Sequence, residues 1–233
     1  SLRYAAALTA LSQATRDHFA RLSPLARDAR VMLAGVDVAA ARNAQPYRRA
    51  RPYILSAARL DLRHKAIDVL IEAFAMVAAE FPTLDLLIVG EGPDRPWLAQ
   101  VAQPWDGRIE IMGVRPRAEL WSLYKGALLF ALPSRMPEGL GLVFLEAMAC
   151  GTPVIGSLSG GTPEIIRDGE TGFLLRDNDP SELAGRIRTI ISQSELRARM
   201  SRETVETVER TFAWSAVAEH FAEIYRNCID SPR

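Results

Sequence analysis

Two glutamates eight residues apart, Glu138 and Glu146, bracket a glycine-rich turn in the otherwise apolar segment PEGLGLVFLEAMACGTPVI. Gly139 and Gly141 let backbone approach a ligand closely, and the turn leads into a predicted helix that begins near Leu142. The free amides at such a helix start can bind an anion, and a carboxylate about one turn further on can accept hydrogen bonds from both hydroxyls of a vicinal diol. The segment therefore predicts a ligand site, with Glu146 suited to a ribose.

Glu146 also has a plainer interpretation, as an acid on the exposed surface of a helix. Its neighbours are almost all apolar, however: Val143, Phe144, Leu145, Ala147 and Met148. A carboxylate in such surroundings needs a partner. Glu138 lies nearer the mouth of the turn, where it would touch whatever extends beyond bound phosphates.

A second group of candidate residues is basic and follows a predicted strand in the segment SAARLDLRHKAID. Its members are Arg59, Arg63, His64 and Lys65. Each cation near the first turn of a helix opposes the helix dipole at a cost of about 0.3–1 kcal/mol, and a bound phosphate or diphosphate would remove that conflict. The alternative is a set of surface cations paired with Asp61 and Asp68, and these residues alone favour neither interpretation.

The turn VGEGPD, residues 89–94, resembles part of a dinucleotide-binding fingerprint. Arg95 stands where that fingerprint has its third glycine, so the prediction of a nicotinamide or flavin site is weak. Gly90 and Gly92 more simply permit a tight turn out of a buried strand.

A further glycine pair occurs in GSLSGGTPEII, residues 156–166. Thr162 is predicted to cap a helix that begins at Pro163, which explains both residues without a ligand. Gly160 and Gly161 are the part of this turn that suggests close backbone contact with a ligand.

The composition argues against several classes of protein. Lys+Arg and Asp+Glu both number 28, so the net charge is zero and nothing indicates a nucleic-acid binder. The two cysteines, Cys150 and Cys228, have no metal-ligand spacing, the three histidines lie apart and the turns described above contain no Asp-x-Asp pair, so neither a metal site nor a nucleophilic triad is predicted. The apolar runs are shorter than the roughly 20 residues of a membrane span, and we expect a cytoplasmic protein.

The elements that position these turns alternate between strand and helix. Short apolar runs predict strands over residues 53–57, 85–89, 109–112, 128–132, 153–157 and 172–175. Helices fill the gaps, and the first, over about 65–80, has apolar residues at helical spacing along one stripe. This order predicts an α/β fold with a doubly wound parallel sheet, in which ligands bind at the carboxyl ends of the strands.

The two ends of the chain do not follow that alternation. Residues 1–38 are predicted to be the tail of a preceding domain, with a strand over 4–9, a serine-capped helix over 12–22 and a short strand within 28–37. Residues 39–51 are predicted to be an irregular linker, 52–211 the ligand-binding domain and 212–233 a C-terminal helix. Because the chain begins at Ser1 without a methionine, we interpret it as a fragment.

These segments together resemble a known family. ARLDLRHK, IVGEGP, IMGVRP, LPSRMPEGLGLVFLEAMACGTPVI and GGTPEIIRDGETGFLL are similar to the C-terminal half of retaining GT-B glycosyltransferases of the family 4 type, also called glycosyltransferase group 1. The likeness extends roughly from Val31 to Tyr225, and the two glutamates match the family's E-x7-E element. Small departures, such as Ala58 and Ala66 at positions where glycine is common, remove no charged contact.

The resemblance implies a Rossmann-like fold and a role for each matching residue. Glu138 would hold the donor sugar at the catalytic centre, and Glu146 would hold the ribose. The implied diphosphate ligands are Arg59, Lys65, Gly139, Leu140, Gly141 and Leu142, and the implied neighbours of the base are Gly113, Val114 and Arg115. No metal or cofactor is implied; the donor would be a UDP- or GDP-linked sugar.

The implied activity is that of a hexosyltransferase-type glycosyltransferase that retains configuration at the anomeric carbon. The missing N-terminal domain would bind the acceptor, a glycan or a lipid-linked molecule, so the fragment alone is expected to transfer little or no sugar. Peripheral membrane contact through that domain stays open. Alternatives are a non-catalytic nucleotide-sugar-binding module and a GT-B-like sugar-nucleotide epimerase; an NAD-dependent oxidoreductase is disfavoured by Arg95.

Overall fold

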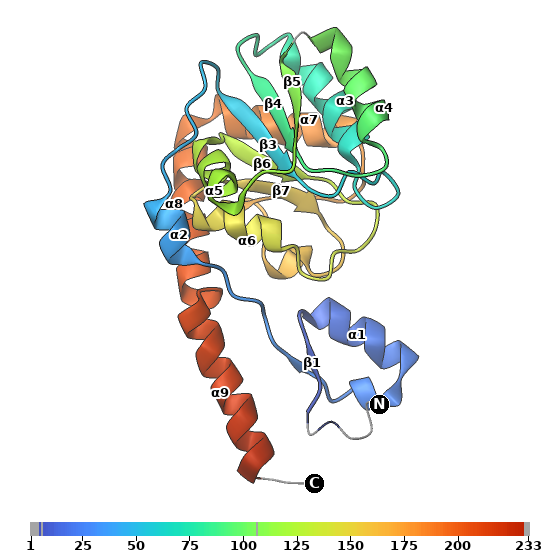
Figure 1. The fold of residues 1–233 in the computed structure, drawn as a ribbon, viewed down its shortest axis with the longest axis vertical. Helices are drawn as coiled ribbons and strands as arrows, with labels where there is room; N and C mark the ends of the chain where they lie inside the picture. Colours follow the sequence, from blue (N-terminus) through green and yellow to red (C-terminus); the bar gives the residue numbers. More distant parts are fainter. Residues whose placement is uncertain (1–4, 6, 106, 231–233) are drawn as a thin grey trace.

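The computed structural model describes residues 5, 7–105 and 107–230 (Figure 1). Its main body is built on a parallel sheet of six strands: β3 (Tyr53–Ala57), β4 (Asp85–Val89), β5 (Ile109–Gly113), β6 (Leu129–Leu132), β7 (Val154–Ser157) and β8 (Gly172–Leu175). The spatial order is β5-β4-β3-β6-β7-β8, and each neighbouring pair is parallel. This is the doubly wound order, with its switch point between β3 and β6. The predicted fold class is confirmed.

Helices cover both faces of this sheet. On one side lie α3 (Ile67–Ala78), α4 (Arg95–Ala102) and α7 (Pro180–Ser192), with α7 packed on α3; on the other lie α5 (Arg117–Gly126) and α6 (Leu142–Ala149), and α6 packs on α8 (Ser194–Thr211) (Figure 1). Short 3₁₀ turns occur at η3 (Gln103–Trp105) and η4 (Thr162–Glu164). The strands are almost wholly apolar because both faces are buried.

The predicted stripe on α3 is buried as expected. Ile67, Leu70, Phe74 and Val77 are all inaccessible to solvent. Phe81 has the spacing of the next apolar residue of this stripe, but it lies beyond the end of the helix at Ala78. The apolar spacing therefore identified the face of the helix that packs on the sheet, but it extended past the end of the helix.

The segment before the sheet forms a small unit beneath the main body. It contains β1 (Thr9–Ala10), α1 (Gln13–Leu22), the 3₁₀ turn η2 (Pro24–Ala26) and β2 (Arg30–Val31), and β1 pairs in parallel with β2. Ser12 caps α1 by accepting from the Thr15 amide, as predicted. Of the strand predicted over 4–9, residues 4 and 6 lie outside the described residues, and strand geometry begins only at Thr9.

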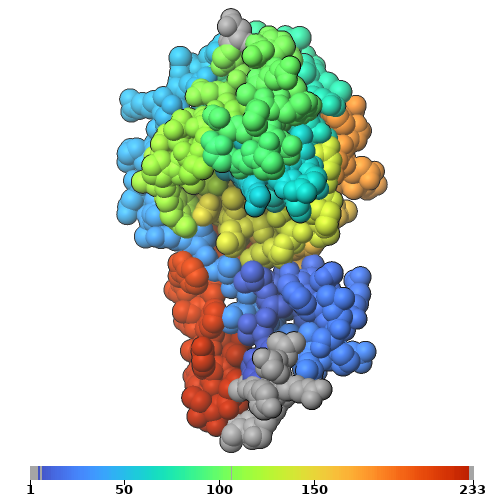
Figure 2. All heavy atoms as spheres, turned by 45° about the vertical axis from the view of Figure 1, so that its right-hand side comes forward, coloured from blue at the N-terminus to red at the C-terminus, as the bar shows by residue number. Residues whose placement is uncertain are grey.

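The segment 39–51, predicted to be an irregular linker, is not irregular in its first part, because α2 (Val38–Asn43) is a helix; its role as a linker stays a prediction. Asp37 caps it by accepting from the Ala40 amide, and the alanine-rich sequence that follows favours helix. At the other end of the chain α9 (Trp214–Asp230) runs down beside the N-terminal unit (Figures 1 and 2).

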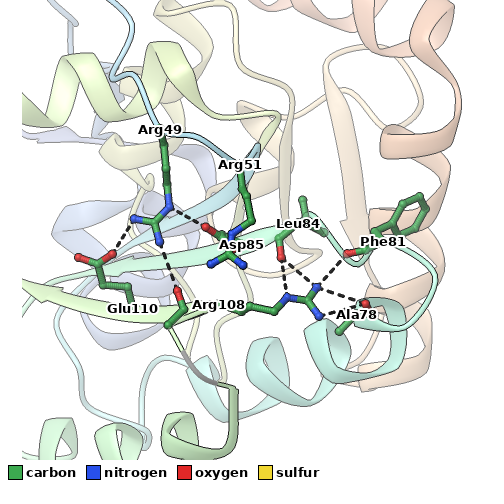
Figure 3. Close-up of polar contacts among 9 residues, drawn as sticks. Arg49, Arg51, Ala78, Phe81, Leu84, Asp85, Arg108 and Glu110 are labelled. Atoms are coloured by element: carbon green, nitrogen blue, oxygen red, sulfur yellow. Dashed lines mark hydrogen bonds and ion pairs between the residues drawn. The ribbon is translucent and has the colours of Figure 1, made fainter.

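The amino-terminal edge of the sheet is held by arginines (Figure 3). Arg49 and Arg51 both form ion pairs with Asp85, whose side chain is completely buried at the start of β4, at 2.6 and 2.9 Å. Arg49 also reaches Glu110 at 2.7 Å. Arg108 donates to the carbonyls of Ala78, the last residue of α3, and of Phe81 and Leu84 beyond it. At this edge the arginine side chains bind to groups of the fold itself.

Candidate functional site

The switch point of the sheet brings together the loops after β3 and β6. The Ala66 amide donates to the Pro133 carbonyl at 2.9 Å, and the Arg135 amide donates to the His64 carbonyl at 2.8 Å. Because both loops leave neighbouring parallel strands at their carboxyl ends, residues about 70 positions apart in the sequence become adjacent. The predicted basic turn and the predicted Glu138 turn therefore form one site.

A hollow of about 420 Å³ lies between these loops. Its lining is mostly charged: Arg59, Asp61, Arg63, His64, Lys65 and Glu138, with Met136 and Pro137. Arg59 is exposed and makes no ion pair or side-chain hydrogen bond with any residue that the structure describes. An unpaired guanidinium at the carboxyl edge of a doubly wound sheet is available to an anionic ligand.

The alternative of surface cations paired with nearby acids holds for part of the basic turn. Arg63 pairs with Asp61 at 2.9 Å, and its hydrogen bonds hold the pKa of that carboxyl well below its usual range. Asp68 pairs instead with Arg135 at 2.7 Å. Neither acid neutralises Arg59 or Lys65.

Glu138 is the acid that neutralises Lys65. The Lys65 ammonium and the Ser134 hydroxyl, the latter at 2.5 Å, both donate to Oε1 of Glu138. Oε2 accepts no hydrogen bond from the described residues, and both partners of the ion pair retain some exposure. One oxygen of Glu138 is thus fixed by protein, and the other can accept a hydroxyl.

The turn after Glu138 supplies free backbone donors. The amides of Gly139, Leu140 and Gly141 donate to no described residue, and α6 begins at Leu142 without a side-chain cap. The first amides of a helix have no partner within it. Consecutive unpaired amides after Glu138 are donors that an anion could accept from, and the anion site predicted for this turn stays a prediction.

Glu146 lies one turn into α6 and is partnered from α5. Tyr124 donates its hydroxyl to Oε2 at 3.1 Å, and Arg117 lies 3.2 Å from Oε1. Burial raises the pKa of Glu146, while Arg117 and the Tyr124 hydroxyl act in the opposite direction. The predicted need for a partner is confirmed. Each oxygen retains a lone pair for a ligand hydroxyl.

The predicted base-proximal residues lie at the end of β5 and just after it. In the sheet, β5 and β6 lie on opposite sides of β3. The Gly113 carbonyl accepts from the Gly90 amide at 2.9 Å, so the turn VGEGPD is tied to this loop. Val114 is exposed, and Arg115 lies 3.4 Å from Glu119. The structure places these residues at the same carboxyl edge as the hollow.

The turn at 156–166 differs from its prediction. Thr162 does not cap a helix: the segment is the 3₁₀ turn η4, its N-cap is Gly161, and the buried Thr162 hydroxyl has no partner among the described residues. Gly160 has φ of +60°, and a Cβ there would lie 2.2 Å from the Glu138 carbonyl oxygen. The close approach that these glycines permit is to protein backbone.

Sequence reasoning missed Ser134, Tyr124 and Arg117 as partners of the two glutamates. Arg117 had a usable signal: it is the first residue of α5, where a cation opposes the helix dipole. The same argument had identified the basic turn after β3. Ser134 and Tyr124 had no such signal, because a single hydroxyl in an apolar run is common.

Within the described residues, no cluster of three or more histidine, cysteine, aspartate or glutamate side chains is arranged to hold a metal ion. No helix in this part of the chain is both long and apolar enough to cross a membrane.

The fold is shared with solved structures, among them a domain of a group 1 glycosyltransferase family protein. Anabaena HepE in complex with UDP-glucose aligns with a TM-score of 0.85 over 97% of this chain and 65% of that one, at 24% identity. The C-terminal domain of LpcC, a group 1 family protein from Francisella tularensis, aligns with a TM-score of 0.67 over 77% of this chain and 100% of that one, at 25% identity. The fold is therefore the Rossmann-like, C-terminal half of a GT-B glycosyltransferase.

Sequence comparison identifies the family within this class. The model for glycosyl transferases group 1 matches residues 37–207, and the chain belongs to that family. D-inositol 3-phosphate glycosyltransferase from Corynebacterium glutamicum is 35% identical over 173 residues. That alignment covers 71% of this chain and 41% of the relative, so the chain spans less than half the length of this relative.

Proposed function

We propose that this chain is the donor-binding part of a glycosyltransferase that transfers a sugar from a nucleoside-diphosphate sugar to an acceptor, with retention at the anomeric carbon. One observation carries the proposal: the unpaired Arg59 faces a hollow that also contains the Lys65–Glu138 pair and adjoins the free amides that follow Glu138. Family membership and the UDP-glucose complex of a protein with the same fold support it.

The diphosphate is assigned to the cationic side of the hollow. Arg59 supplies an unpaired planar guanidinium, and Lys65 supplies an ammonium that Glu138 holds in place. The amides from Gly139 to Leu142 supply neutral donors. Since these groups are in position before reaction, they would stabilise the negative charge that grows on the leaving diphosphate without a metal ion.

Glu138 is assigned to the donor sugar. Its Oε1 is committed to Lys65 and Ser134, which leaves Oε2 to accept a sugar hydroxyl. A carboxylate neutralised by an ammonium is a weakened nucleophile. We therefore give Glu138 a positioning role at the catalytic centre, not that of the covalent nucleophile of a retaining glycosidase.

Glu146 is assigned to the ribose, and Gly113 to Arg115 to the neighbourhood of the base. Arg117 is largely exposed, so it can move aside at little cost when a diol reaches the Glu146 carboxylate. Tyr124 is buried and holds the other oxygen in place. Burial of the carboxylate strengthens its hydrogen bonds to hydroxyls.

The complete protein is proposed to be larger than this chain. Residues 1–38 would then be the end of an acceptor-binding domain, 39–51 the linker, 52–211 the donor domain and 212–233 a helix that returns toward the first domain. The acceptor would meet the donor between the domains, so this chain alone is expected to bind donor and to transfer little sugar. We propose a cytoplasmic protein with any membrane contact in the missing domain.

A thermal-shift panel tests the proposal and identifies the donor. The parent chain and its Lys65→Ala variant are each heated without ligand and with UDP, GDP, ADP and their common sugar conjugates. A ligand at 100 times its Kd adds about 2.7 kcal/mol of stability. We expect one base to raise the Tm of the parent and to lose most of that effect in the variant. No shift with any nucleotide, in this chain and in the full-length protein alike, would overturn the proposal.

A further inference from the structure

The start of α1, in the N-terminal unit, contacts the turn of residues 138–141, which we call the donor loop. Ser12 donates its hydroxyl to the Gly139 carbonyl at 2.5 Å, and Thr15 donates to the same oxygen at 3.1 Å. The Ser12 side chain is completely buried, and a Cβ on Gly161 would lie 3.0 Å from the Ser12 Cβ. Figure 2 shows this blue segment pressed against the yellow residues of the main body. The contact is therefore close-packed.

A second contact fixes the same helix end to η4. The Glu164 carboxylate accepts from the amides of Gln13 and Ala14, at 2.8 and 2.9 Å. A carboxylate on two free amides at a helix N-terminus is favoured by both hydrogen bonding and the helix dipole. Gly161, just before η4, donates its amide to the Glu138 carbonyl, which joins η4 to the turn that follows Glu138.

The carbonyl of Gly139 determines where the next amide points. A trans peptide is planar, and its N–H points opposite to its C=O. Two hydroxyls that hold the Gly139 carbonyl toward α1 therefore aim the free Leu140 amide away from α1. The Leu140 amide is one of those assigned to the diphosphate, and the Leu140 side chain is buried.

We propose that Ser12, Thr15 and Glu164 form a clasp that positions the Leu140 amide for the diphosphate, so that α1 contributes to donor binding without touching the donor. This inference rests on the proposed function, because it names positioning residues for that same site. Its consequence is a coupling: displacement of α1 from the main body releases the Gly139 carbonyl and weakens the anion site. A donor that binds these amides in turn favours the docked position of α1.

Paired measurements on the chain test the clasp. The double variant Ser12→Ala/Thr15→Val removes both hydroxyls from the Gly139 carbonyl, and UDP and GDP are titrated into it by calorimetry. We expect the nucleotide that binds the parent to bind about ten-fold more weakly, from the loss of two hydrogen bonds that hold the peptide plane. We also expect the NMR order parameter of the Leu140 amide to fall from about 0.85 toward about 0.6 in the ligand-free protein.

Matched variants separate this role from stability. Thr15→Ser keeps the hydroxyl that Thr15→Val removes, without adding an atom to the packed contact, and should keep the parental affinity. Gln13→Ala changes the same helix through a side chain whose one hydrogen-bond partner among the described residues is Asp17, and it should leave affinity unchanged. Thr15→Val alone keeps the Ser12 cap of α1 and should give an intermediate loss.

Two outcomes overturn the clasp: parental affinity in the hydroxyl-free double variant, or an equal loss in Gln13→Ala. If neither UDP nor GDP binds the parent, the thermal-shift panel on this chain and on the full-length protein decides the proposed function, and the order parameter of the Leu140 amide decides the clasp. An unchanged Leu140 amide in the double variant then overturns it, and a loosened amide supports it.

Discussion

The two edges of the sheet use their cations in opposite ways. At the amino edge, Arg49 and Arg51 converge on the buried Asp85, and Arg108 is bonded to three carbonyls (Figure 3). At the carboxyl edge, Arg59 has no partner among the described residues, and Lys65 is held by an acid that keeps one oxygen free. A cation whose bonds the fold completes stabilises the fold, whereas a cation left unpaired at the switch point is available to a ligand.

The largest effect is expected at the amino edge, on stability alone. Arg49→Ala/Arg51→Ala leaves the completely buried Asp85 carboxylate without a charged partner. Breaking a buried ion pair from one side costs about 3–5 kcal/mol, and we expect a loss of that size in the free energy of unfolding measured with urea. Arg48→Ala, an exposed neighbour, is the control and should be close to neutral. Equal stability of the two variants would show that the network is not structural.

The next effect is expected at the carboxyl edge, on binding alone. Arg59→Ala removes a charged donor from the proposed diphosphate, worth about 1.5–3 kcal/mol, so calorimetry should show nucleotide affinity about 10- to 150-fold lower. The unfolding free energy should stay within about 0.5 kcal/mol of the parent, since no described contact is lost. If Arg59→Ala loses stability but keeps its nucleotide affinity, Arg59 serves the fold and not a ligand.

A smaller effect is expected in the pH dependence of Glu146→Gln. Burial raises the pKa of Glu146 above its ordinary value of 4.5. In the pH interval between the ordinary pKa and the raised pKa, the folded chain therefore binds more protons than the unfolded chain. Stability contributed by this group is therefore greatest at acid pH and falls as pH rises through the interval. Urea unfolding of parent and variant across pH 4 to 8 should show the parent losing stability relative to Glu146→Gln. If the stability of the parent relative to Glu146→Gln stays constant or rises with pH, the assignment is contradicted.

Much of this comparison was predictable from the sequence at the carboxyl edge. Each predicted strand of the main sheet lies within one residue of its observed bounds, because buried parallel strands are short apolar runs between turns. Since a parallel order collects loops at one edge, the two candidate turns could be placed together before any coordinates were known. Arg59 and Glu138 followed from that placement.

The amino edge and the contacts of α1 were not predictable in the same way. Arg49 and Arg51 sit in a segment that looked like a polar linker, and only the strand register reveals that both reach Asp85. Thr162 had the sequence of a helix cap, but the chain there makes a single 3₁₀ turn. Glu164 accepts from the amides of Gln13 and Ala14, about 150 residues away in the sequence, and hydrogen bonds between such distant segments leave no pattern in either one.

The central claim, that the unpaired cation of the carboxyl edge serves a nucleotide diphosphate, is tested most directly by a crystal structure of the chain with the nucleoside diphosphate that binds most tightly. The account predicts the diphosphate in the hollow, within hydrogen-bond distance of the Arg59 guanidinium and the amides after Glu138. A diphosphate bound elsewhere, with Arg59 still turned to solvent, would contradict it.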